Sequence, residues 1–130
     1  MKQEIEKYIL EPMLLTSIMV SLISILWFQE KQYIMAGLLF CNGISSYIYH
    51  YDNTDRFLYY DLFFSVSSFI CSLMLARRLL VKNLYELLMI VLVAFLYYTL
   101  NVIYDEYYFH IMWHIMVIIG QLYLVRNVIL

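Results

Sequence analysis

Long apolar segments alternate with short polar ones along this chain. Each apolar segment is about 20 residues long, the length of helix that crosses a hydrocarbon core of about 30 Å. The segments predicted to span a membrane lie at approximately 9–28, 33–50, 57–76, 84–104 and 107–125. Because the connections between them are short, the pattern predicts an all-α integral membrane protein folded as an up-and-down bundle of about five transmembrane helices.

Composition supports this fold class and limits the possible partners. The chain is 65% hydrophobic and 14% charged, whereas soluble domains are about 45–50% apolar. No hydrophilic segment is long enough to fold separately, so residues 1–130 are expected to form a single transmembrane domain in a lipid bilayer. The only basic cluster is Arg77, Arg78 and Lys82, which argues against nucleic acid as a partner.

The distribution of basic residues predicts how the bundle is oriented in its membrane. With five spans, the N-terminus shares one side with the second and fourth connections. The basic residues on that side are Lys2, Lys7 and Arg56. Those on the opposite side are Lys31, Arg77, Arg78, Lys82 and Arg126. The positive-inside rule therefore predicts a cytosolic C-terminus and a non-cytosolic N-terminus.

All three histidines lie inside apolar segments or at their ends, where polar side chains are costly and usually functional. His110 and His114 are four residues apart, so both rings project from one helix face. His50 ends the second segment and Asp61 lies early in the third. Strict alternation of the spans brings these four residues to the same, non-cytosolic side, and Ser46 lies one turn before His50.

This set of side chains has the chemistry of a catalytic zinc site. Three neutral imidazoles with one open position are the usual ligand set, so we predict that His50, His110 and His114 bind Zn²⁺. Zinc lowers the pKa of bound water to near neutrality and polarises a carbonyl group, which makes the water a nucleophile. Asp61 is then the candidate base or proton shuttle, and Ser46 would hold the water or stabilise an oxyanion.

The same residues resemble the motifs of a superfamily of intramembrane zinc hydrolases, the alkaline ceramidases and the adiponectin and progestin receptors. That superfamily has S-x-x-x-H on the second span, an aspartate early on the third and H-x-x-x-H on the last. Here these positions are Ser46 with His50, then Asp61, then His110 with His114. The resemblance implies that the histidines hold zinc and that the serine and aspartate surround its water.

Further features are similar to the ceramidase branch: the eleven-residue step from His50 to Asp61, and Glu11 followed by Thr16 and Ser17 in the first span. This branch implies a ceramide-like lipid amide as substrate and the orientation predicted above. The family has seven spans, so two helices are missing here between Asp61 and His110. The acidic calcium-binding segment that precedes the first span of ceramidases is also missing, and calcium regulation is not expected.

Three functions remain open from the sequence. The first is zinc-dependent hydrolysis of a lipid amide within the membrane, with zinc-bound water as the nucleophile. The second is a structural zinc site in a non-catalytic, ceramidase-like pseudoenzyme. In either case a homo-oligomer would be able to replace the cavity wall that the two missing helices form in the family. The third is a haem held by His50 and one histidine of the pair.

Overall fold

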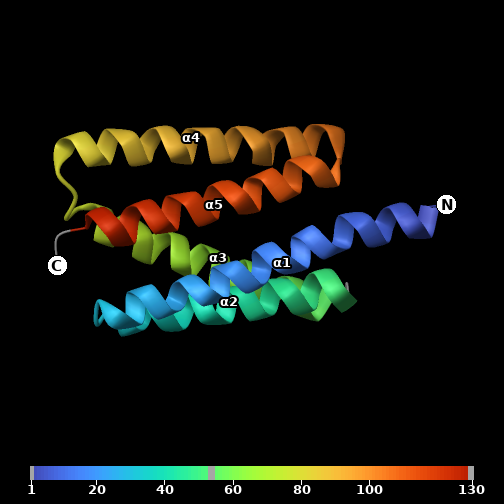
Figure 1. The fold of residues 1–130 in the computed structure, drawn as a ribbon, viewed down its shortest axis with the longest axis horizontal. Coiled ribbons are helices and arrows are strands. Elements are labelled where there is room, and N and C mark those ends of the chain that lie inside the picture. The colour runs from blue at the N-terminus through green and yellow to red at the C-terminus, as the bar shows by residue number, and fades with distance from the viewer. Residues whose placement is uncertain (1, 53–54, 129–130) are drawn as a thin grey trace.

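A computed structural model of the chain consists of helices that run back and forth along one axis (Figure 1). The structure describes the backbone of residues 2–52 and 55–128 and the side chains of residues 12–51, 56–106 and 108–128. The helices are α1 (Lys2–Gln29), α2 (Tyr33–Asp52), α3 (Asp55–Ala76), α4 (Val81–Tyr104) and α5 (Tyr107–Asn127). Their ends agree with the predicted segments to within a few residues, except that α1 begins well before the predicted start. The prediction of an all-helical bundle is confirmed.

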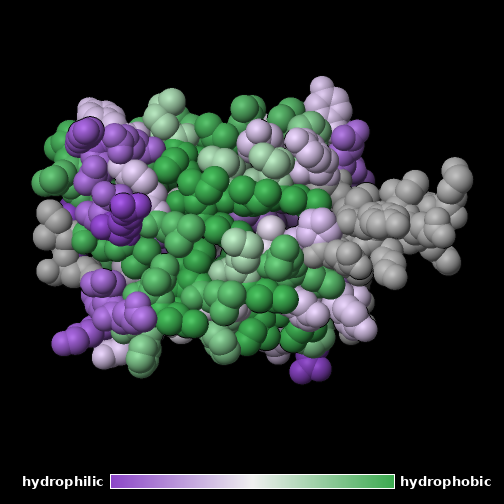
Figure 2. All heavy atoms as spheres, viewed as in Figure 1, coloured by the Kyte–Doolittle hydropathy of each residue, from purple (hydrophilic) through white to green (hydrophobic). Residues whose placement is uncertain are grey.

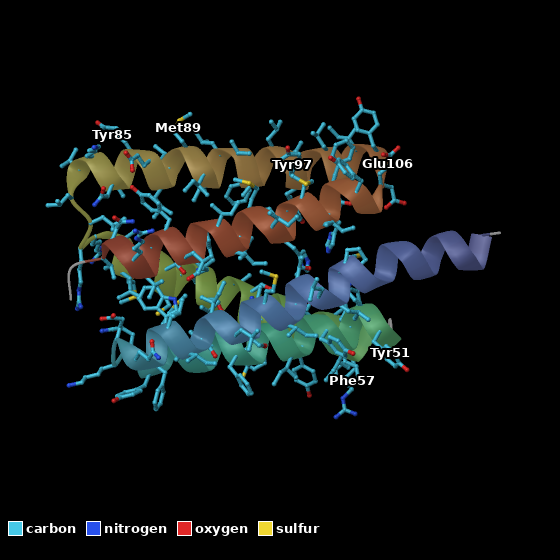
Figure 3. All side chains as sticks on the ribbon, viewed as in Figure 1. Tyr51, Phe57, Tyr85, Met89, Tyr97 and Glu106 are labelled. Atoms are coloured by element: carbon cyan, nitrogen blue, oxygen red, sulfur yellow. The ribbon has the colours of Figure 1, made fainter. Side chains whose placement is uncertain are left out.

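Four of the helices are long and apolar enough to cross a membrane. The qualifying segments are Pro12–Gln29, Arg56–Ala76, Val81–Tyr104 and Tyr108–Asn127. Their outer faces carry exposed apolar side chains, such as Met89 of α4, which points away from α5 (Figure 3). Figure 2 shows a broad band of hydrophobic residues across the middle of one face, with hydrophilic residues gathered towards the two ends. These are the surface properties of an integral membrane protein.

The second predicted span, 33–50, differs from the other four. Helix α2 has 20 residues and is therefore about 30 Å long, but it does not reach the hydropathy of a membrane span. Asn42, Ser46 and His50 lower its hydropathy, and all three line an internal cavity. These three polar side chains of α2 thus line the cavity between the helices.

The five helices divide into two packing groups. Helix α1 packs against α2 and α5, α2 also packs against α3, and the main partner of α4 is α5. The apolar core lies at the end where α1 finishes, and its largest fully buried side chains are Trp27, Met35, Leu39 and Leu124. Nε1–H of Trp27 donates a hydrogen bond of 3.2 Å to Oε1 of Gln121, which ties α1 to α5 inside this core.

Helices α1 and α2 cross at Gly43, and the crossing is too close for a side chain at this position. A Cβ atom there would lie 2.6 Å from the backbone nitrogen of Ser21 and 2.7 Å from the carbonyl oxygen of Ser17. Glycine is therefore required by the space between two backbones. The crossing sets Ser46, one turn further along α2, directly against α1.

The C-terminal ends of α2 and α4 and the N-terminal end of α5 lie at the same end of the bundle. Asp105 ends α4 in the left-handed conformation (φ 49°), which aspartate tolerates better than most residues, and its N–H donates to the carbonyl of Asn101. Glu106 then leads directly into α5. Figure 3 shows Glu106 in this turn and Tyr51 near the end of α2, both at the end opposite the C-terminus.

Candidate metal centre

The three histidines meet inside the bundle at that end. One ring nitrogen from each of His50, His110 and His114 lies within 4.8 Å of the other two. The Nε2 atoms of His110 and His114 are 3.0 Å apart, and the ring centroid of His50 lies 5.1 Å and 5.3 Å from those of His110 and His114. Helix α2 supplies one ring and α5 supplies two, as the alternation of spans predicted.

His50 has a nitrogen without a partner. Its Nε2 atom is buried and makes no hydrogen bond with any residue that the structure describes. An unsatisfied buried polar atom costs about 1–3 kcal/mol, so native proteins rarely keep one without a reason. Here the atom belongs to a ring that packs against two other imidazoles, and a bound cation would satisfy it.

The other two histidines are held from behind by neighbouring helices. Nδ1 of His114 lies 3.1 Å from Oγ1 of Thr16 on α1, and Nδ1 of His110 lies 3.4 Å from Nδ2 of Asn101 on α4. Metal-binding histidines usually donate the N–H of the far nitrogen to a neighbouring acceptor, which fixes the orientation of the ring. Oγ1 of Thr16 is such an acceptor for His114, whereas Nδ2 of Asn101 holds the His110 ring as a donor. Both Nε2 atoms therefore point into the cluster.

Ser46 lies beside the histidines, and its hydroxyl is held by α1. Its Oγ is 3.1 Å from Oγ of Ser17, which in turn donates its proton to the carbonyl of Met13 at 3.0 Å. Because Ser17 has only one proton, Ser46 must be the donor of the bond between them. The cavity side of Ser46 then offers only lone pairs, which suit it to hold a water molecule and do not suit it to donate to an oxyanion.

Asp61 lines the same cavity as the histidines and Ser46. The cavity has a volume of about 400 Å³, and Asp61 is the only acidic residue among its described lining residues. Asp61 is not part of the group of side chains that could hold a metal ion. All five residues singled out in the sequence thus line one cavity, and the three histidines among them form the ligand group.

The cavity continues beyond the histidines along the bundle. Asn42 and Ser65 form part of its wall and are joined by a hydrogen bond of 2.8 Å. A smaller apolar cleft of about 100 Å³ lies between α3 and α4 over α5. The residues that line both spaces are Phe69, Trp113, Val117 and Gln121. The larger cavity, which contains the histidines, therefore adjoins a smaller apolar cleft.

The donor set fits a zinc ion. Nitrogens bound to zinc in a tetrahedral site at about 2.0–2.1 Å lie about 3.3 Å from one another. The Nε2 atoms of His110 and His114, 3.0 Å apart, are close to this spacing, and all three nitrogens lie within 4.8 Å of one another, so a shift of the rings toward a common ion would complete the site. Together with the unpartnered Nε2 of His50, three nitrogens in this arrangement have the chemistry of a three-histidine metal site.

The same arrangement argues against a haem. A macrocycle held between His50 and one histidine of the pair would occupy the plane midway between the two rings. The third ring is nearly equidistant from both, with centroid distances of 4.7–5.3 Å throughout the cluster, so it lies in that plane. A porphyrin would collide with it.

Some partners in the site could not be assigned from the sequence. Thr16 and Ser17 were noted only for their similarity to ceramidases, and the sequence pattern assigned no part in the site to Asn101. Their signal is weak because a hydroxyl or amide in a span is usually a packing residue. The side chain of Glu11, the other first-span residue of that comparison, lies outside the described side chains.

Comparison with known proteins gives no relative from which a function could be transferred. No family model matches the chain, and neither curated proteins nor solved structures give a significant match.

Proposed function

We propose that this protein is a zinc-dependent intramembrane hydrolase of a lipid amide, and that it is a shortened relative of the alkaline ceramidases. The observation that carries the proposal is the meeting of three imidazoles, one with an unpartnered buried nitrogen, in a cavity that Asp61 and Ser46 also line. His50, His110 and His114 would hold the zinc. When bound, zinc supplies Lewis acidity, which polarises a carbonyl group and activates water for attack.

The chain's own residues have separate tasks in this reaction. Asp61 is the one described acid in the cavity wall, so it accepts a proton from the attacking water and returns it to the leaving amine. Ser46 accepts a hydrogen bond from that water, because its own proton is committed to Ser17. The surrounding apolar and aromatic side chains limit the access of other water molecules.

The shape of the cavity supports a lipid as the substrate. The apolar cleft between α3 and α4 adjoins the cavity and lies between two helices apolar enough to face a bilayer. A ceramide-like molecule would place its amide near the histidines and a hydrocarbon chain in this cleft. The exposed basic residues at the turn between α3 and α4 support a cytosolic location for that end of the bundle and a non-cytosolic location for the site.

A second candidate is a structural zinc site without turnover. It is favoured by the small volume of the cleft, about 100 Å³, which leaves little room for a long chain. In this case zinc would join α2 to α5 and stabilise the bundle only.

Two measurements on the purified protein test the proposal. The first is the metal content of wild type and His114→Ala: we expect close to one zinc per chain, and loss of it in the variant. The second is hydrolysis of ceramide and related lipid amides by the zinc-loaded protein and by Asp61→Asn. Because Asp61 lies outside the ligand group, the variant should keep its zinc and lose turnover.

Asp105→Asn is the matched control for Asp61→Asn. It makes the same change of side chain at an exposed position in the α4–α5 turn, where asparagine adopts the left-handed conformation readily. It should leave both zinc and turnover unchanged. Zinc without hydrolysis of any lipid amide by the wild type would favour the structural site, and absence of zinc would refute both candidates.

A further inference from the structure

We infer that Thr16 of α1 is a positioning residue that fixes which nitrogen of His114 carries the proton, and so presents the other nitrogen to the metal. Only the metal-binding part of this inference rests on the proposed function, because the position of the proton is a property of the metal-free protein. Thr16 is buried, with 6% of its surface exposed, and its Oγ1 lies 3.1 Å from Nδ1 of His114.

Counting donors assigns the direction of this hydrogen bond. Oγ1 of Thr16 donates its only proton to the carbonyl of Met13, at 2.9 Å. Toward His114 it therefore has lone pairs alone, and the bond forms only if Nδ1 of His114 carries a proton. A neutral imidazole has one N–H, so Nε2 of His114 is left with its lone pair facing the cluster. This is the form of histidine that binds a metal through Nε2.

The remaining contacts agree with this assignment. Nε2 of His114 lies 3.0 Å from Nε2 of His110, so the proton between them must belong to His110. Nδ1 of His110 is then an acceptor, and Nδ2 of Asn101 is positioned to donate to it at 3.4 Å. A continuous series of hydrogen bonds thus runs from Asn101 through both histidines to Thr16 and ends at the Met13 carbonyl.

The two histidines are prepared for a metal to different degrees. His114 already presents a lone pair at Nε2. His110 must first move its proton to Nδ1, and Asn101 can accommodate this because rotation of its amide offers an oxygen in place of the NH₂ group. Thr16 has no such alternative while its proton is bonded to the Met13 carbonyl. The hydroxyl therefore fixes His114, and the amide permits His110 to change.

The test compares Thr16→Val, which has nearly the same shape without the hydroxyl, with Thr16→Ser, which restores it. The matched control is Thr99→Val on α4, where the same substitution removes a hydroxyl that bonds only to a carbonyl of its own helix, that of Phe95. The first readout is the ¹⁵N NMR spectrum of the histidine rings in metal-free protein, with the His114 signals assigned by their absence from His114→Gln. The second readout is zinc affinity.

We expect the metal-free wild type, Thr16→Ser and Thr99→Val to show His114 protonated at Nδ1, and Thr16→Val to lose this preference. Zinc affinity should fall about 10–100-fold in Thr16→Val, the usual effect of removing the partner of a ligand histidine, and should be recovered in Thr16→Ser. Because wild type and Thr16→Ser carry the prediction by themselves, the test stands even if Thr16→Val does not fold.

Two results would overturn the inference: a wild-type His114 protonated at Nε2, or a folded Thr16→Val with unchanged His114 signals and unchanged zinc affinity. Failure of the proposed function would look different. A wild type that binds no zinc but shows His114 protonated at Nδ1 would refute the metal site and leave the role of Thr16 in place.

Discussion

The crossing of α1 and α2 at Gly43 gives a quantitative prediction about Gly43→Ala. The added methyl group would lie 2.0 Å from Oγ of Ser21, which can rotate away, but also 2.6 Å from a backbone nitrogen, which cannot. Because ordinary contact begins near 3.4 Å, the two backbones would have to separate by roughly 0.8 Å at the crossing. Overpacking of this kind usually costs about 1–3 kcal/mol.

Gly37→Ala is the matched control on the same helix. A Cβ atom at Gly37 would meet no described atom within 4 Å, so this variant retains only the gain from replacing glycine in a helix, about 0.5–1 kcal/mol. The same gain applies to Gly43→Ala. The difference in unfolding free energy between the two variants therefore isolates the crossing, and we expect Gly43→Ala to be about 1–3 kcal/mol less stable than Gly37→Ala.

The assay is reversible unfolding in mixed detergent micelles, followed by circular dichroism, for both variants and wild type. The site supplies a second readout. Separation of the helices by roughly 0.8 Å would lengthen the contact between Ser17 and Ser46 from 3.1 Å to about 3.9 Å, beyond the range of a hydrogen bond. Because this contact orients the hydroxyl that would hold the attacking water, turnover should fall in Gly43→Ala and not in Gly37→Ala. Equal stability of the two variants would show that α1 and α2 do not approach as described.

Two further predictions concern the core and the metal. Trp27→Phe should lower stability by about 1–3 kcal/mol, because Trp27 is fully buried and its loss leaves Oε1 of the half-buried Gln121 without its donor. Trp113→Phe removes no hydrogen bond among the described residues and should cost less, and detergent unfolding measures both variants. At free zinc 100 times above the dissociation constant, binding should stabilise the wild type by about 2.7 kcal/mol, so a chelator should lower its Tm. His114→Ala should show no such response, and an equal shift in both proteins would count against the site.

The helices could be predicted from the sequence because the boundaries of α3, α4 and α5 lie within a few residues of changes from apolar to polar residues. Helix α2 shows where this reasoning reaches its limit. Its start was predicted correctly and its end to within two residues. Its hydropathy is nevertheless low, because it carries the polar residues Asn42, Ser46 and His50, which line the cavity. Hydropathy averages over a helix and does not record which face is lined by polar residues.

The convergence of the site could also be predicted, because alternation of spans determines which end of the bundle each residue reaches. Alternation does not determine which helices are side by side. The roles of Thr16 and Asn101 depend on α1 lying against α5 and on the tight turn between α4 and α5, and both are results of packing. The direction of the Ser46 hydroxyl likewise depends on Ser17, across the crossing at Gly43.

The division of the helices into two packing groups has a consequence for assembly. Helices α1–α3 form one group and the α4–α5 hairpin another, and the two meet mainly where α1 packs on α5. His50 belongs to the first group, while His110 and His114 belong to the second. Coordination of a metal by all three histidines would therefore be the last step of assembly, because it requires both groups to be inserted and docked. Two coexpressed fragments, divided in the turn between α3 and α4, should therefore associate more tightly with zinc than without it.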